Sequence, residues 1–415
     1  MSGLPATLDL DAAAAIRWDA LVVGAGPAGA AAALRLARHG LQVLLIDRGT
    51  LPRGKLCGCC LSPAAVAELR RLGMPGDESL ALAVPLRRIR LACDGREAGI
   101  DVRGGATLSR EVLDATLAAA AVRAGAQWLP RTAAVAIDEA DDGEPLAVVA
   151  VRGAAGDGDR TVRLVCRRLL LATGLGDRVR RPAAAVEPAA AVLPRSRIGI
   201  GAVLPAAVAA LPPGELLMAV AAWGYCGIVR LEDGRLDVAA AVDRRGLAAV
   251  SPAATIRRIV RDACGPGSAA ASLDGLDAVA IRATPALTRS APLVAGTARN
   301  VFRIGDAAGY VEPFTGEGMG WALAAGRLVA ESLVEGRGGG LVPAAVAADR
   351  YARVHARSLG PRQARCRGVA AGLRHPGLVG LAVRAARLAP WAARLAVPAV
   401  VGGRASRPGF AGGDA

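Results

Sequence analysis

The sequence predicts an α/β protein with a Rossmann-like nucleotide-binding domain, and three observations lead to this prediction. A glycine-rich turn at residues 24–29 follows an apolar run at residues 21–23. A helix of small residues is expected directly after the turn, at residues 30–39. A second glycine-rich segment, residues 305–320, follows another apolar run far downstream. Strand, glycine turn and helix in this order form the unit that holds a pyrophosphate at a helix N-terminus.

The first glycine turn matches the pattern G-x-G-x-x-G in its proper context. Its glycines let the backbone approach a pyrophosphate closely, and the helix N-terminus stabilises the negative charge. A second apolar strand is expected at residues 41–46, and Asp47 closes it at the distance typical of an acid that binds a ribose. The residues predicted here to contact a cofactor are Gly24, Gly26, Pro27, Ala28, Gly29, Asp47 and Arg48.

The second glycine segment predicts that the cofactor is FAD, because a plain NAD-binding domain does not need it. Residues 301–304 read as a strand, and Asp306 at its end can accept hydrogen bonds from ribityl hydroxyls. A helix is expected from about residue 318 to 332, and its N-terminal amides would face the flavin edge that becomes negative on reduction. The alternative is an ordinary strand, turn and helix. The residues predicted to contact FAD here are Gly305, Asp306, Pro313, Gly316, Gly318 and Met319.

With these motifs, residues 18–335 resemble the FAD-dependent oxidoreductases that include geranylgeranyl reductases and class A flavin monooxygenases such as p-hydroxybenzoate hydroxylase. Residues 52–58 are similar to the P-R-x-K-x-C-G loop of the reductases, and Arg110 stands where a family arginine contacts FAD. A third family element, usually Asp-Gly, touches the pyrophosphate and NAD(P)H. This chain has Thr173 and Gly174 there, so the resemblance implies FAD contacts while the missing aspartate weakens the case for a nicotinamide contact.

The resemblance implies a discontinuous FAD-binding domain of the glutathione reductase type, with an inserted antiparallel sheet that holds the substrate. We expect the FAD-binding domain at residues 1–84, 106–185 and 280–335, the substrate domain at 85–105 and 186–279, and a helical C-terminal region at 336–415. Substrate-domain strands are predicted at residues 86–91, 198–203, 217–222, 226–231 and 235–242. Asp233 and Gly234 mark a hairpin turn between the last two of these strands.

Lys55, Cys57 and Tyr225 are the predicted catalytic residues. Lys55 is the one lysine among 51 basic residues. Arginine is always charged, whereas a lysine ammonium is compact and shifts its pKa readily, so a lone lysine indicates lysine chemistry; the alternative is a solvated surface charge. Cys57 matches the cysteine of the reductase loop. Tyr225 lies where lipid reductases have Y-x-W-x-F-P-K, a pattern of which only the tyrosine remains here.

The cysteines and the N-terminus indicate a reducing, intracellular setting without a metal. The eight cysteines follow no disulfide or zinc spacing, although Cys57, Cys59 and Cys60 share one loop with no histidine nearby. Asp9 and Asp11 stand where an export signal would be basic. We therefore expect a cytoplasmic protein with no metal site.

The net charge of +15 is concentrated near the C-terminus, since residues 351–415 carry eleven arginines and one acidic residue. Nucleic-acid binding would need stacking aromatics and a recognisable module, and neither is evident. Interleaved apolar residues predict a peripheral contact with the anionic inner face of the membrane. The alternative is a tail that packs on its own protein.

The resemblance implies an FAD-dependent oxidoreductase, with NAD(P)H as the expected electron donor. Low charge in the strands at 198–231 indicates a hydrophobic small substrate, such as an isoprenoid or a polyketide-derived phenol. The expected reaction is hydride transfer to a carbon–carbon double bond, as in geranylgeranyl reductases. The alternatives are a flavin monooxygenase that hydroxylates an aromatic substrate, and a flavin electron carrier without a small substrate.

Overall fold

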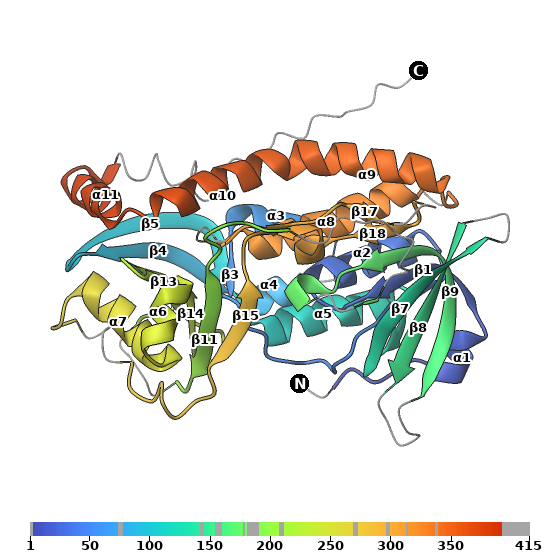
Figure 1. The fold of residues 1–415 in the computed structure, drawn as a ribbon, viewed down its shortest axis with the longest axis horizontal. Coiled ribbons are helices and arrows are strands. Elements are labelled where there is room, and N and C mark those ends of the chain that lie inside the picture. The colour runs from blue at the N-terminus through green and yellow to red at the C-terminus, as the bar shows by residue number, and fades with distance from the viewer. Residues whose placement is uncertain are drawn as a thin grey trace.

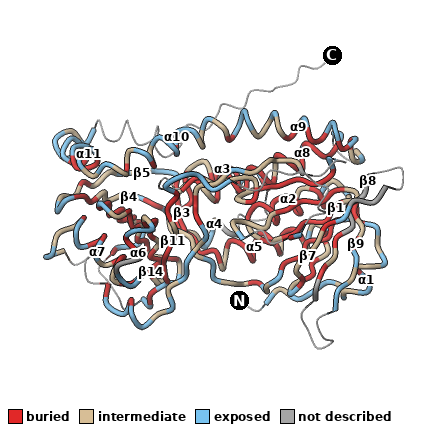
Figure 2. Tube along the Cα trace, viewed as in Figure 1, coloured by how far each residue is buried: buried red, intermediate tan, exposed pale blue. Residues whose placement is uncertain are grey.

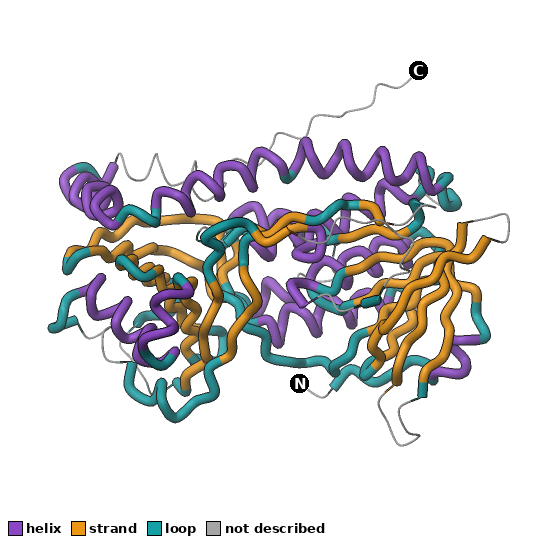
Figure 3. Tube along the Cα trace, viewed as in Figure 1, coloured by secondary structure: helices purple, strands orange, loops and turns teal. Residues whose placement is uncertain are grey.

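The computed structural model describes the whole chain except residues 1–2, 74–77, 142–144, 154–159, 177–178, 181–190, 207–210, 269–272, 296–298, 313, 315, 337–338 and 392–415. Its described part is an α/β fold in which two large mixed sheets lie side by side, each with helices of its own (Figure 1). Helices also run along one side of the molecule across both sheets, as Figure 3 shows.

The first sheet has the strand order β17-β18-β9-β1-β2-β6, and the hairpin β7-β8 is attached to β9. The strands are β1 (Arg17–Val23), β2 (Val43–Ile46), β6 (Gln127–Leu129), β7 (Thr132–Asp141), β8 (Pro145–Gly153), β9 (Thr161–Leu171), β17 (Val294–Ala295) and β18 (Val301–Arg303). The run from β18 to β6 is parallel. Its central strands are almost uniformly apolar, as expected for a parallel sheet buried on both faces.

Three helices cover one face of this sheet: α2 (Pro27–Arg38), α5 (Arg110–Arg123) and α8 (Gly318–Leu333). Small residues let them approach closely, since a Cβ on Gly326 of α8 would lie 2.2 Å from the carbonyl oxygen of Ala28. Shorter helices are α1 (Leu10–Ala14), α3 (Pro63–Arg71) and α4 (Glu78–Leu82). The two glycine-rich segments are thereby brought together, because α2 follows the first and α8 follows the second.

The second sheet has the order β15-β11-β14-β13-β12-β4-β5-β3. Its strands are β3 (Cys60–Leu61), β4 (Val84–Cys93), β5 (Arg96–Thr107), β11 (Ile198–Leu204), β12 (Glu215–Ala221), β13 (Gly224–Arg230), β14 (Leu236–Val242) and β15 (Arg282–Ala286). All five strands predicted for this part of the chain are present, and the predicted turn at Gly234 joins β13 to β14. Helix α7 (Pro252–Cys264) buries its apolar side on one face of the sheet, next to α6 (Arg244–Ala249).

The prediction of a purely antiparallel second sheet was wrong at one position, because β4 and β12 run parallel. The hairpin β4-β5 belongs to an earlier part of the chain and reaches β12 only after a long excursion through the first sheet. A tight turn forces antiparallel pairing, whereas a long connection leaves the direction free. A small third sheet joins β10 (Ala191–Val192), β16 (Arg289–Ser290) and β19 (Gly309–Tyr310).

The C-terminal region forms α9 (Ala344–Ser358), α10 (Gly360–Gly372) and α11 (Pro376–Leu388). Helix α9 packs on α8, and α11 packs on β5 and β4 of the second sheet (Figure 1). Val379 and Val383 face inward from α11, whereas its outer side is exposed (Figure 2). The described part of this region therefore packs on the rest of the chain. Within the residues described, no helix is both long and apolar enough to span a membrane.

Candidate active site

The first glycine turn lies tightly against the end of β9. A Cβ on Gly24, which has φ +109°, would lie 2.4 Å from the carbonyl oxygen of Ala172, and one on Gly29 would lie 1.9 Å from the carbonyl oxygen of Gly24. Side chains are therefore excluded at both positions. Pro27 begins α2 directly after the turn, so the first amides of this helix are available to an anion at the sheet edge.

Asp47 lies at the carboxyl end of β2, beside this turn. Its carboxylate accepts hydrogen bonds from the amides of Ala25 (2.8 Å) and Gly49 (2.9 Å) and pairs with the Arg53 guanidinium. Burial would raise the pKa of Asp47, but Arg53 and the two amides outweigh it, so the pKa is lowered. Asp47 is thus a buried carboxylate at the predicted ribose position, while Arg48 next to it is exposed.

The second glycine segment contacts the first one directly. Gly305 has φ +60°, and a Cβ there would lie 2.8 Å from the Cβ of Ala28 in the first turn of α2. Asp306 follows in a short 3₁₀ turn, η4 (Gly305–Ala308), at the end of β18. Burial raises the pKa of Asp306, although Lys55, Arg110 and Arg289 oppose the shift through their positive charges.

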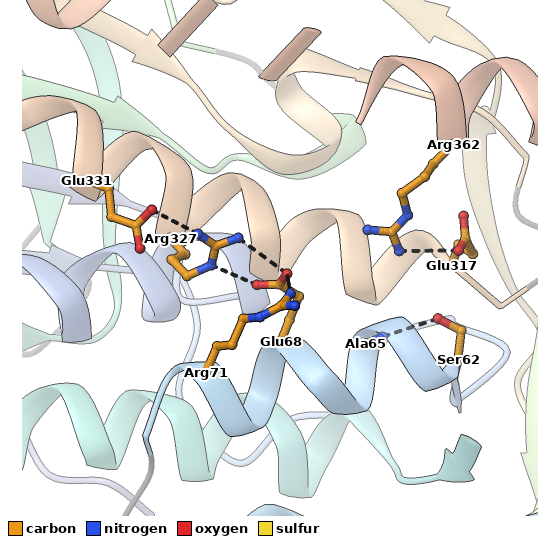
Figure 4. A network of polar contacts seen from close by, with 8 residues as sticks. All are labelled: Ser62, Ala65, Glu68, Arg71, Glu317, Arg327, Glu331 and Arg362. Atoms are coloured by element: carbon orange, nitrogen blue, oxygen red, sulfur yellow. Dashed lines mark hydrogen bonds and ion pairs between the residues drawn. The ribbon is translucent and has the colours of Figure 1, made fainter. Parts of the chain in front are cut away.

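Helix α8 is held by polar contacts at its start and midway along its length (Figure 4). Arg327 of α8 donates to Glu68 of α3 (2.8 Å), and Arg362 of α10 donates to Glu317 at the helix start (3.2 Å). Glu317 is buried, and its carboxylate also accepts a hydrogen bond from the indole N–H of Trp321. The amides of Gly318 and its neighbours are thereby fixed in place. The side chain of Met319 is buried in the core, so a cofactor can use only its backbone. Pro313, a predicted FAD contact, lies outside the described residues.

Arg110 begins α5 and forms a buried two-bond ion pair with Asp114, at 2.8 and 2.6 Å. A Cβ on Gly26 would lie 3.5 Å from the Arg110 guanidinium, so this arginine borders the first glycine turn. Burial would lower the pKa of Arg110, but Asp114 raises it. The ion pair with Asp114 therefore keeps the Arg110 guanidinium positively charged beside the glycine turn.

Lys55 lies near Gly174 and interacts electrostatically with Asp306 of the second glycine segment. Its Nζ would be 3.4 Å from a Cβ on Gly174, which lies three residues after the end of β9. Burial and Arg110 lower the pKa of Lys55, against the opposing charges of Asp306 and Asp114. Lys55 is an exposed residue, and it borders an open cavity.

This cavity has a volume of about 220 Å³ and lies between the cofactor-side helix α5 and the second sheet. Its polar lining includes Lys55, Arg110, Arg235 and Asp237. Asp237 is a buried residue on β14 that the sequence analysis missed; a single acid in the apolar strand Leu236–Val242 was the signal available for it. Burial, together with the nearby Cys57, raises the pKa of Asp237 well above its usual range.

Cys57 and Cys59 lie near both the arginine and this carboxyl group. Cys59 lines the cavity together with Arg110 and Asp237, and Cys57 interacts electrostatically with all three of these residues. The neighbouring Cys59 thiol and the charge of Arg110 lower the pKa of Cys57 to about 6, in spite of its burial.

Tyr225 lies in a separate aromatic cluster, on the face of the second sheet that also carries Asp237. Its ring packs edge-on against Phe314, with the centroids 5.1 Å apart, and the Arg197 guanidinium lies 5.5 Å above it. Arg197 is almost fully buried and donates to Glu312 at 3.0 Å. Burial, with Glu312 adding to it, raises the pKa of Tyr225. The pair Arg197–Glu312 could not be predicted, because the two residues are 115 positions apart and no local sequence pattern marks either of them.

A bound dinucleotide fits the residues at the sheet edge. The hydroxyl of Thr173 is buried and has no hydrogen-bond partner in the described structure, although it lies next to the glycine turn. An unpaired buried hydroxyl is costly, so a ligand atom that pairs with it is favoured. Gly24 and Gly29 leave the close backbone approach that a pyrophosphate needs. Among the described residues, no group of three or more potential ligand side chains is arranged to hold a metal.

Comparison with known proteins identifies the cofactor. Residues 17–185 match the family model described as FAD binding domain. The chain is 31% identical over 355 residues to menaquinone reductase of Mycobacterium tuberculosis, which covers 81% of each chain. The chain belongs to this family of FAD-dependent oxidoreductases.

Two solved structures share the fold of this flavoprotein. The myxobacterial chondrochloren halogenase, an FAD-dependent halogenase, has a TM-score of 0.68 at 19% identity, with 92% of both chains covered. A geranylgeranyl bacteriochlorophyll reductase-like protein of Thermoplasma acidophilum has a TM-score of 0.63 at 17% identity, covering 89% of this chain and 91% of the other. The flavoprotein is thus an enzyme on a fold that serves both reductases and halogenases, and the prediction of an FAD-dependent oxidoreductase is confirmed.

Proposed function

We propose that this flavoprotein reduces a carbon–carbon double bond of a hydrophobic isoprenoid, with an isoprenoid quinone as the first candidate substrate and NAD(P)H as the electron donor. The similarity to menaquinone reductase over four fifths of both chains supports this substrate class. The observation that carries the proposal is the position of Lys55, which borders the cavity next to the second sheet and interacts electrostatically with Asp306 and Arg110 of the expected cofactor site.

FAD, when bound, supplies the reducing equivalents that such a reaction needs. The amides of both glycine turns, Thr173 and Asp306 would hold it, with Asp47 at the ribose and Arg110 as a fixed positive charge. Gly316 and Gly318 lead into α8, whose first amides would carry part of the negative charge that reduction brings. These residues bind and orient the cofactor.

Lys55 is the proposed proton donor for the second half of the reaction. Saturating a double bond adds one hydride and one proton, and an acid beside the cavity must supply the proton. The lowered pKa of Lys55 makes its Nζ a stronger acid than a solvated lysine. Cys57 would shape the wall of the site, and Tyr225, packed on Phe314, would border the substrate from the second sheet.

A flavin monooxygenase is the second candidate, because the fold is shared with an FAD-dependent halogenase. The two reactions leave different products: a reductase adds two hydrogen atoms to its substrate, whereas a monooxygenase adds one oxygen atom and consumes oxygen. The purified, FAD-loaded protein should be given an isoprenoid quinone and NAD(P)H with and without oxygen. We expect a product heavier by two hydrogen atoms, formed equally well without oxygen. An oxygenated product that forms only in air would reject the reductase.

We also propose that the outer face of α11 rests on an anionic membrane surface, where a hydrophobic substrate would be found. Val379 and Val383 anchor the helix on the second sheet, whereas Leu378, Leu381 and Leu388 are 60%, 63% and 88% exposed. Trp391 follows at 69% exposure. The helix contains Arg384 and Arg387 and no acidic residue, so its charge complements anionic lipid headgroups.

A further inference from the structure

Cys57 and Cys59 form a close pair of thiols that the proposed reaction does not use. Only Gly58 separates them, and Cys57 packs against the buried cluster of side chains to which Cys59 and Cys60 belong. The backbone of Cys59 lies in the left-handed region, with φ +47°, which bends the loop at this residue. Neither cysteine is in a disulfide. The two sulfur atoms are therefore neighbours in a loop that is not part of a regular strand.

The two thiols have opposite electrostatic surroundings. The neighbouring Cys59 thiol and the positive charge of Arg110 lower the pKa of Cys57 to about 6, so Cys57 is largely a thiolate at neutral pH. The neighbouring Cys57, burial and the nearby Asp237 raise the pKa of Cys59 well above its usual range, so Cys59 keeps its proton. One nucleophilic thiolate thus lies next to one protonated thiol.

Small molecules can reach this pair from the cavity. Cys59 lines the cavity of about 220 Å³ that Lys55 also borders, and Cys57 is only half-buried. The next cysteine, Cys60, begins β3 and is buried with its pKa raised by desolvation. Burial also raises the pKa of the half-buried Cys264 on α7, to about 11. Cys60 has no positive partner, and at Cys264 burial and the charge of Glu97 outweigh the charge of Arg90, so these two cysteines serve as internal controls.

We propose that Cys57 and Cys59 are a peroxide-sensitive pair that closes to an intramolecular disulfide. In the first step the Cys57 thiolate attacks one oxygen of hydrogen peroxide, which breaks the O–O bond, forms a sulfenic acid and releases hydroxide. In the second step the Cys59 sulfur attacks the Cys57 sulfur, the S–O bond breaks, and the Cys59 proton leaves with the departing hydroxyl as water. The pair loses two electrons, and the peroxide takes them up.

The disulfide would act on the loop that carries the proposed proton donor. Lys55 lies two residues before Cys57, and Cys59 forms part of the cavity wall. Closing the pair would remove the thiolate charge of Cys57, which interacts with Arg110 and Asp237. Oxidation is therefore a reversible modification at the edge of the cavity, independent of which substrate the enzyme reduces.

The test uses the full-length protein, first reduced and then treated with hydrogen peroxide at neutral pH. Peptide mass spectrometry should find a Cys57–Cys59 disulfide that dithiothreitol reverses. Oxidation at Cys57 should be on the order of ten-fold or more faster than at Cys264, because its thiolate fraction is much larger while each thiolate is somewhat less nucleophilic. Oxidation of Cys57 no faster than Cys264, or a bond between Cys57 and Cys60, would overturn the proposal.

Three variants separate the two steps. Cys59→Ser should stop at a sulfenic acid on Cys57 that dimedone captures, whereas Cys57→Ser should form neither product. Cys60→Ser, the matched control, should still form the Cys57–Cys59 disulfide. Rapid loss of the Cys59 thiol in Cys57→Ser would contradict the assigned order of steps. Each readout is a mass, so the result stands apart from the success of the proposed reductase reaction.

Discussion

Gly305 packs directly on Ala28, so closely that a Cβ at Gly305 would fall 2.8 Å from the Cβ of Ala28. Each residue belongs to one of the two glycine motifs, which lie far apart in the sequence. The contact fixes the distance between the start of α2 and the turn η4. This distance determines the space that is available to an extended cofactor. Substitutions at this contact and at the polar groups around it test how the site is built.

Gly305→Ala should destabilise the protein and weaken FAD binding. The left-handed backbone disfavours a side chain by about 1 kcal/mol, and the clash with Ala28 adds roughly 1–3 kcal/mol. Gly40→Ala is the matched control, because Gly40 has φ +78° and no atom within 4 Å of a Cβ. It should lose only about 1 kcal/mol. Chemical denaturation of both variants measures this difference, and equal losses would show that the contact contributes nothing.

Thr173→Val should lower FAD retention about five- to ten-fold, the effect of one hydrogen bond. The apoprotein should be no less stable, because the substitution removes a buried hydroxyl that has no partner in the described structure. Asp306→Ala should also weaken retention, by removing the acceptor for ribityl hydroxyls. Thr116→Val is the control, since its hydroxyl donates to the Val112 carbonyl within α5. Flavin fluorescence titration gives the affinities; wild-type affinity in Thr173→Val would place this hydroxyl away from FAD.

Lys55→Arg should keep FAD bound and slow turnover on the order of 100-fold, because a guanidinium is a poor proton donor. The pKa of Lys55 lies below 10.5, so in the wild type the protonated donor is lost, and the rate falls, as the pH rises through that lowered value. This alkaline fall should vanish in Lys55→Arg, which stays protonated. Arg282→Lys makes the reverse exchange at the cavity wall and should leave the profile unchanged. Identical pH–rate profiles for the wild type and Lys55→Arg would remove Lys55 from the reaction.

Glu312→Ala should destabilise the protein by roughly 3 kcal/mol, because it leaves the buried charge of Arg197 with only the more distant Asp243. Asp349→Ala is the control: it breaks the ion pair with Arg299, in which both side chains are about half exposed, and should cost under about 1 kcal/mol. Urea denaturation compares the two variants. Similar losses in both would mean that the buried pair beside Tyr225 stabilises the protein no more than a surface pair does.

The double variant Leu381→Glu with Leu388→Glu should lose binding to anionic vesicles, and wild-type binding should weaken as salt rises. Substitution suits this test better than deletion of α11, because removing the buried Val383 would expose the second sheet. Leu82→Glu, at a leucine 53% exposed on α4, is the matched control and should bind as the wild type does. Vesicle co-sedimentation measures the binding, and unchanged binding of the double variant would refute the membrane contact.

The local motifs of this protein could be predicted because their chemistry lies in short stretches of chain. A glycine turn between an apolar strand and a small-residue helix needs no distant partner to be recognised, and both turns occur where the sequence places them. The five strands of the second sheet were also predictable from their apolar runs. Lys55 was conspicuous through composition alone, as the one lysine in an arginine-rich chain.

The sequence by itself determined the elements, the two glycine turns and the expectation of FAD, since each depends on backbone conformation over a few residues. Only the tertiary structure decided which side chains meet. Asp237 of β14 lines the same cavity as Cys59, Arg197 pairs with Glu312 from a distant part of the chain, and β4 lies parallel to β12. Such pairings depend on how sheets and helices pack over long separations, and burial then shifts the pKa values of the groups they enclose. No local pattern encodes that burial, so the acid and the thiol pair at the cavity became visible only in the folded chain.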